Sequence, residues 1–84
     1  MKLNLRAEFL DGRTIDPIPV IMPDMLKFEE KFNLSVATLA KSEKLTHIVF
    51  LAWASLSRTK QTDKSFEDFI ETVSAVSASE SDPN

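Results

Sequence analysis

The 84-residue chain lacks cysteine and has a single glycine. Without cysteine it can form neither a disulfide nor a thiolate-ligated zinc or iron–sulfur site. Because the one glycine lies in an Asp-Gly turn sequence, no glycine-rich loop is left to cradle a phosphate. The longest unbroken apolar run, Ile48 to Ala54, is far shorter than the roughly 20 residues that cross a bilayer. We therefore expect no cofactor, no metal ion and no membrane association.

The charge balance argues against a nucleic-acid partner. Ten lysine and arginine residues are set against thirteen acidic ones, which gives a formal net charge of −3 and a pI near 5.0. Nucleic-acid binding needs a basic patch or stripe, whereas the basic residues of this chain are scattered. With 43% apolar residues, the length suits one small globular domain. We place that domain at residues 1–76 and a flexible tail at residues 77–84.

The N-terminal third predicts a β-hairpin. Apolar and polar residues alternate from Lys2 to Phe9, as in a half-buried strand. Asp11-Gly12 follows and is typical of a two-residue type I′ turn, in which both residues have positive φ. Pro17 and Pro19 lack the backbone N–H that a central strand needs, so the second strand should be an open edge. Addition of a partner strand at that edge is a possible function.

The apolar residues of the two strands match only if the register changes. A two-residue turn places Leu5 opposite Ile18 but leaves Ile15 opposite Glu8. One extra residue reverses which face a strand presents. We therefore expect a β-bulge near Asp16-Pro17.

Two short helices are predicted next. Asp24 can cap the first, in which Met25, Phe28 and Phe32 share one face and Asn33 marks the end. The second is expected from Ser35 to about Lys41, with Ser35 as its cap.

The segment from about Glu43 to Arg58 predicts the main helix of the core. Its apolar stripe consists of Leu45, Ile48, Val49, Ala52 and Leu56, at helical spacing. Phe50, Leu51 and Ala54 fall on the far side of that stripe and Trp53 on its border. Two interpretations remain open: the helix is covered by the domain on both sides, or Phe50, Leu51, Trp53 and Ala54 form a partner-binding or self-association patch.

A last helix is predicted after Ser65-Phe-Glu-Asp68, which has the form of a capping box. Its apolar stripe is Phe66, Phe69, Ile70, Val73 and Val76. The patterns together predict an α+β fold in which the N-terminal β-hairpin packs on a small bundle of three to four helices.

No catalytic site is indicated. His47 is the only histidine, and we place it on the polar side of its helix, without a nucleophile or a second metal ligand at suitable spacing. No glycine-rich elbow presents Ser55 or Ser57 as a nucleophile. The carboxylate pairs Glu29-Glu30 and Glu67-Asp68 lie opposite the apolar stripes and are interpreted as solvated surface. Glu67, Asp68 and Glu71 form an alternative acidic contact patch. We expect no enzyme.

The order of these features resembles the small tail assembly chaperones of long-tailed bacteriophages, especially the short proteins from phages of actinobacteria. The resemblance covers about four-fifths of the chain. Its most specific element is the Phe-Leu-Ala-Trp stretch, followed by a basic residue and an aromatic-acidic-aromatic helix. The matching segments are Asp11-Gly12, Met25-Leu-Lys-Phe-Glu-Glu-Lys-Phe32, Leu34-Ser35-Val36, Thr46-His-Ile-Val-Phe-Leu-Ala-Trp53, Arg58 and Ser65-Phe-Glu-Asp-Phe-Ile70.

The resemblance implies a non-enzymatic chaperone that acts before the phage tail is complete. Such proteins coat the long, helical tape measure protein, keep it soluble and help recruit tail tube subunits around it. They work in the host cytoplasm and are absent from the mature virion. Besides the tape measure and tail tube proteins, a second copy of this chain, as a homo-oligomer, is a candidate partner. Many also exist in a longer, frameshifted form, whose extension would start in residues 77–84 here. One departure from the family is that related short proteins often carry a longer acidic tail than residues 77–84.

Two other functions fit a small acidic domain. One is a structural connector or tail completion subunit that stays in the virion. The other is a small phage-encoded inhibitor of a host enzyme.

Overall fold

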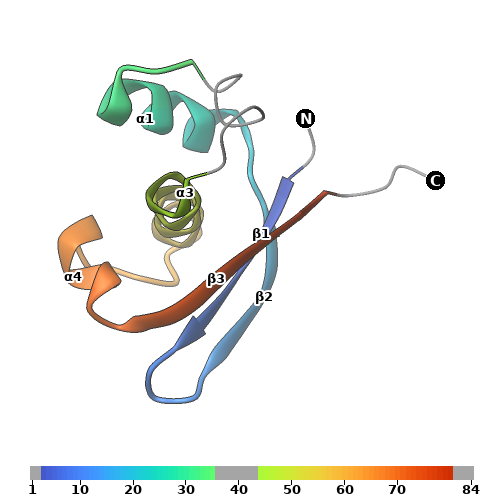
Figure 1. Cartoon of the computed structure of the whole chain (residues 1–84), viewed down its shortest axis with the longest axis vertical. Coiled ribbons are helices and arrows are strands. Elements are labelled where there is room, and N and C mark those ends of the chain that lie inside the picture. The colour runs from blue at the N-terminus through green and yellow to red at the C-terminus, as the bar shows by residue number, and fades with distance from the viewer. Residues whose placement is uncertain (1–2, 36–43, 81–84) are drawn as a thin grey trace.

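The computed structural model describes residues 3–35 and 44–80. These residues form one three-stranded antiparallel sheet of strand order β2-β1-β3, together with three helices. Helix α3 lies against one face of the sheet, and α1 and α4 pack on α3 from the other side (Figure 1). The predicted α+β class with an N-terminal hairpin is confirmed. The elements are β1 (Leu3–Phe9), β2 (Thr14–Pro19), α1 (Met22–Phe32), α3 (Leu45–Arg58), α4 (Phe66–Ile70) and β3 (Val73–Glu80).

The short helix expected from Ser35 to about Lys41 falls on residues 36–43, outside the described part of the chain. Within the two described ranges, no helix has both the length and the apolar character needed to cross a membrane. Helix α1 ends at Asn33, as predicted, and this residue adopts a left-handed conformation with φ 53°. Asparagine tolerates that conformation better than most residues do.

The hairpin turn has three residues rather than two. The N–H of Phe9 donates to the carbonyl of Arg13 over 2.9 Å, and the N–H of Gly12 donates to the carbonyl of Phe9 over 3.0 Å. Gly12 has a φ of 94°, whereas Asp11 does not have a positive φ. The predicted type I′ turn is therefore wrong. A three-residue loop that ends in a left-handed glycine is the next commonest hairpin connection.

Local hydrogen bonds hold the Asp11 side chain in this loop. Its carboxylate accepts from the backbone N–H of Arg13 over 3.0 Å and from Nε of Arg13 over 2.8 Å. These interactions, the backbone hydrogen bond first, lower the pKa of the Asp11 carboxyl from its ordinary value. They require the ionised form, so Asp11 supports the turn only above the pH at which it becomes protonated.

The register of β1 and β2 changes where the sequence predicts a bulge. Leu5 lies opposite Ile18, as expected, but Ala7 lies opposite Ile15. The extra residue of β2 falls at Asp16-Pro17, which confirms the bulge. Strand β2 is also an edge of the sheet, as its two prolines predict.

The last predicted helix is wrong beyond Ile70. Helix α4 begins after Ser65, whose hydroxyl accepts from the N–H of Asp68 over 3.2 Å and so confirms the predicted cap. The chain then leaves the helix, and Val73–Glu80 form β3 along β1. The boundary expected at Ser77 therefore falls inside a strand, and the first residues of the expected tail belong to the sheet.

A second bulge explains why β3 has a helix-like sequence. Val73 lies opposite Phe9 and Val76 lies opposite Ala7, with a register shift beside them that leaves Ser74 as the extra residue. Both valines therefore face the helices, although they are three residues apart and a regular strand would point them to opposite faces. Residues three apart also share one face of a helix, so the periodicity of this segment alone predicts a helix where the structure has a strand.

A buried carboxylate joins α1, α3 and the end of β2. Asp24 is predicted as a helix cap, but it lies in the first turn of α1 and is fully buried. Its Oδ2 accepts from the N–H of Ile21 over 3.1 Å and from the hydroxyl of Ser55 over 3.0 Å. Its Oδ1 accepts from Nε of Arg58 over 3.0 Å, and Nη2 of Arg58 donates to the carbonyl of Pro19 over 3.3 Å. A buried charge with this many partners is compensated rather than costly.

Replacing Arg58 by methionine should destabilise the fold by about 3 kcal/mol, because the buried carboxylate loses its cation. This is a large share of the roughly 4 to 13 kcal/mol expected for a chain of this length. Arg13→Met is the matched control, since it removes a similarly short pair with Asp11. The Arg13 side chain is 73% exposed and that of Arg58 26%. Arg13→Met should cost less than about 1 kcal/mol. Urea denaturation of both variants measures the difference, and equal losses would contradict the role of the Asp24 pair.

Candidate partner-binding site

The four residues proposed as a partner patch do not form an exposed surface. Phe50, Leu51 and Ala54 are buried, and Trp53 is half-buried. Helix α3 contacts β1, β2 and β3 on one side and α1 and α4 on the other. The structure thus agrees with the interpretation of α3 as a central core helix. Of the four residues, only Trp53 is partly exposed to solvent.

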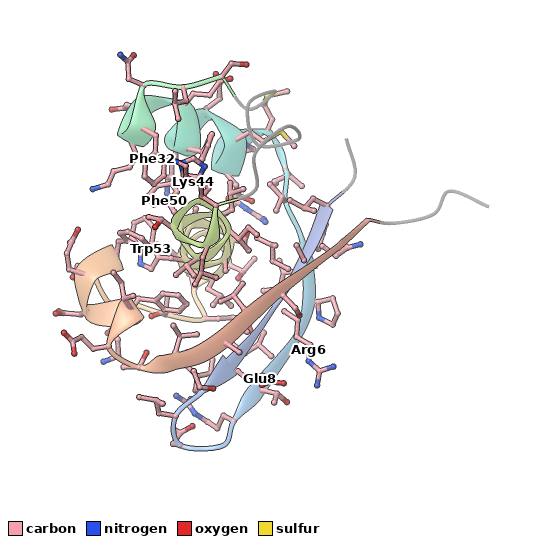
Figure 2. All side chains as sticks on the ribbon, viewed as in Figure 1. Arg6, Glu8, Phe32, Lys44, Phe50 and Trp53 are labelled. Carbon is pink, nitrogen blue, oxygen red and sulfur yellow. The ribbon has the colours of Figure 1, made fainter. Side chains whose placement is uncertain are left out.

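Aromatic rings from three helices cover the far side of α3. Phe50 is 5.3 Å from Phe32 of α1, 5.2 Å from Phe66 of α4 and 5.5 Å from Trp53, measured between ring centroids. Edge-to-face and tilted pairs at these distances contribute beyond the burial of area alone. Figure 2 shows Phe32, Phe50 and Trp53 on the side of α3 that faces away from the sheet.

An open groove of about 680 Å³ lies over this aromatic cluster, between α1 and α4. Its floor is aromatic and its rim is charged. Trp53 and Phe66 are only half-buried, so their rings remain available to a ligand. The residues that line the groove are Lys27, Glu30, Lys31, Phe50, Trp53, Ser65, Phe66 and Glu67.

Two lysines of α1, four residues apart and so on one helix face, reach over the floor. Nζ of Lys27 lies 5.9 Å from the ring centroid of Trp53, and Nζ of Lys31 lies 5.8 Å from that of Phe66. These are cation–π distances. Lys31 also lies 3.9 Å from a carboxylate oxygen of Glu67, an exposed and weak ion pair. The groove therefore combines apolar contact with a charged α1 side, on which two lysines outnumber one glutamate, Glu30.

The Trp53 ring is held in place before any ligand binds. Its indole N–H donates to the carbonyl of Lys64 over 2.8 Å. Its ring lies 5.9 Å from that of Phe66. A preorganised aromatic surface loses little side-chain entropy on binding.

His47 is not on the polar side of its helix, so that prediction is wrong. It is buried, with its ring 5.0 Å from that of Phe28 and 4.7 Å from that of Phe32. Its Nδ1 is buried and has no hydrogen-bond partner in the part of the chain that the structure describes. The aromatic side chains of α1, Phe28 and Phe32, cover this side of α3. The periodicity of α3 alone does not reveal that contact.

The other polar candidates are also accounted for. Ser55 is buried and donates to Asp24, so it serves the core. Glu67, Asp68 and Glu71 are exposed on α4. Within residues 3–35 and 44–80, no three His, Asp or Glu side chains gather in a way that could hold a metal ion.

Comparison with family models, with curated proteins and with solved structures gave no match.

Sequence reasoning missed the groove, although part of its signal was visible. Lys27 and Lys31 are four residues apart, along one flank of the apolar face of α1. Nothing in the sequence shows that this lysine pair and Phe66 flank the same rings of α3, because α1 and α4 are more than 30 residues apart in the chain.

Phe50→Asp should abolish cooperative thermal unfolding, since it places a charge at a site that is only 4% exposed, among three aromatic rings. Leu26→Asp is the control, because Leu26 is 56% exposed on α1, and it should melt cooperatively near the wild-type temperature. Circular dichroism and light scattering report both variants. A folded, monomeric Phe50→Asp protein would contradict the core assignment.

Proposed function

We propose that this chain is a non-enzymatic tail assembly chaperone of a long-tailed bacteriophage. It binds the tape measure protein, keeps it soluble and helps recruit tail tube subunits. The resemblance described above suggests the class, and the observation that carries the proposal is the open aromatic groove between α1 and α4. A chaperone of a long helical protein needs a surface of this kind.

The groove suits an amphipathic helix. An apolar side chain of the partner would rest on the half-buried rings of Trp53 and Phe66, as anchors do in helix-in-groove recognition. Acidic side chains on the next turn of the same partner helix would meet Lys27 and Lys31. These lysines already lie close to the rings, so one partner face can use both contacts.

The same geometry favours reversible binding. The groove is open, and its lysines are exposed rather than buried, so electrostatic contact is screened and contributes modestly. A shallow site with two aromatic anchors gives weaker binding than a deep, fully desolvated one. Release of the partner is what a chaperone that leaves before tail completion requires. We propose that it acts in the host cytoplasm during assembly, as the resemblance implies.

The double variant Lys27→Glu/Lys31→Glu should reduce soluble tape measure protein on co-expression, because the α1 rim then repels acidic partner residues. Arg6→Glu/Lys60→Glu changes the net charge equally outside the groove and is the control. Figure 2 shows Arg6 on the sheet face away from the helices. Solubility is scored by fractionation and immunoblotting, after circular dichroism confirms that both variants are folded. Equal solubility with the two variants would remove the groove from the proposal.

Purified mature virions should contain none of this protein, whereas lysates taken during assembly should contain it together with tape measure protein. Quantitative mass spectrometry of both samples makes the comparison. Stoichiometric copies in the virion would instead identify a structural connector or tail completion subunit.

A further inference from the structure

Strand β3 forms one edge of the sheet, because the strand order is β2-β1-β3. In Figure 1 it is drawn in front of β1 and β2. Beyond its pairing with β1, no backbone hydrogen bond joins residues 73–80 to another element of the described chain. Within residues 3–35 and 44–80, the outer edge of this eight-residue strand has no partner strand.

The hydrogen bonds around β1 show which backbone groups of β3 face outward. The carbonyl of Leu3 accepts from Val20 beside β2, whereas the carbonyl of Glu8 accepts from the hydroxyl of Ser74 in β3. The backbone N–H and C=O groups of odd-numbered residues in β1 therefore point toward β2, and those of even-numbered residues point toward β3. Arg6 pairs with Ser77, so the backbone groups of Ser77 are directed at β1. By alternation, those of Val76, Ala78 and Glu80 are directed outward.

The two edges of the sheet differ in how they are protected. Strand β2 carries two prolines and a bulge, which are devices that prevent pairing with another strand. Strand β3 has neither proline nor lysine, and its only bulge, at Ser74, lies near its start. From Thr72 to Ser79 it has no charged residue. Its exposed residues there are small: Ser74, Ala75, Ser77 and Ala78.

We propose that two copies of this chain pair through the outer edges of β3, antiparallel, and join their sheets into one. A second copy fits this edge because an antiparallel pair of identical strands has twofold symmetry and closes as a dimer. When this pairing is centred on Ser77, Val76 of one copy lies opposite Ala78 of the other, and Glu80 of one copy lies opposite Ser74 of the other. The outward backbone groups of Val76 in one copy and Ala78 in the other then form hydrogen bonds with each other. No like charges lie opposite each other, and the small side chains allow the two strands to approach closely.

This interface is separate from the groove. The groove lies between α1 and α4, on the far side of α3 from the sheet, whereas the proposed interface extends the sheet from β3. A dimer would carry two grooves on one joined sheet, and a long helical partner that reaches both grooves binds more tightly than one that reaches a single groove. The dimer can exist whether or not the groove binds tape measure protein.

Sedimentation velocity over a wide range of concentration tests the dimer. The wild-type protein should sediment as a concentration-dependent dimer. Ala78→Pro removes an outward N–H without removing a bond to β1, so it should raise the dimer dissociation constant at least tenfold, or about 1.4 kcal/mol, with little change in melting temperature. Ser77→Pro is the matched control, since its N–H is directed at β1 and its loss should lower the melting temperature. A monomeric wild-type protein, or an Ala78→Pro protein that dimerises like wild type, would overturn the proposal.

A cysteine placed at the twofold position gives an independent readout. The chain has no cysteine, so Ser77→Cys introduces a single thiol. Directly opposite residues in a non-hydrogen-bonded antiparallel pair have Cα atoms about 4.5 Å apart, which is within the range for a disulfide. Mild oxidation should crosslink Ser77→Cys into dimers much faster than Thr14→Cys, on the exposed edge strand β2. Equal crosslinking rates would place any self-association elsewhere.

Discussion

Helix α3 is apolar around nearly its whole circumference, and covering it is the constraint that organises this small domain. The sheet takes one side, and the aromatic residues of α1 and α4 take the other. Burial of Phe50, Leu51 and Ala54 contributes to the hydrophobic free energy that stabilises so short a chain. The fully buried Asp24 carboxylate makes the packing of α1 on α3 specific, because its hydrogen bonds with Ser55 and Arg58 fix the position of α1. Apolar contact alone would leave that docking less specific.

The candidate groove is a consequence of that packing. Helices α1 and α4 both pack on the side of α3 that faces away from the sheet. They do not cover it completely, so Trp53 and Phe66 remain partly exposed between them. The Lys27 and Lys31 side chains then cover the rings without sealing them. The domain can in this way keep a partly exposed aromatic surface within a charged rim. The sheet offers the second interaction surface, at the edge that carries no protecting proline.

Local sequence patterns predicted the parts of the fold in which local preference and tertiary packing agree. The hairpin, the bulge at Asp16-Pro17, the cap at Ser65 and the end of α1 at Asn33 all follow from residue types at fixed positions. Patterns failed where a partner distant in the chain decides the outcome. Asp24 has the signature of a cap, yet its ligands on α3 are more than 30 residues away. Asp11 has the signature of a type I′ turn, but the loop takes one residue more.

The sequence by itself determined the α+β class and the need to cover α3, because alternation at the N-terminus and apolar residues around one helix allow little else. Tertiary structure alone decided that Val73–Glu80 is a strand. Val73 and Val76 stand at helical spacing, and only the bulge at Ser74 lets both face the core from a strand. The free edge of β1 offered backbone partners to these residues, which a short C-terminal helix would have left unused. Tertiary structure also determined which of the candidate partner-binding residues are exposed. Phe50, Leu51 and Ala54 are buried, whereas Trp53 lies in a groove because α1 and α4 cover only part of that side of α3.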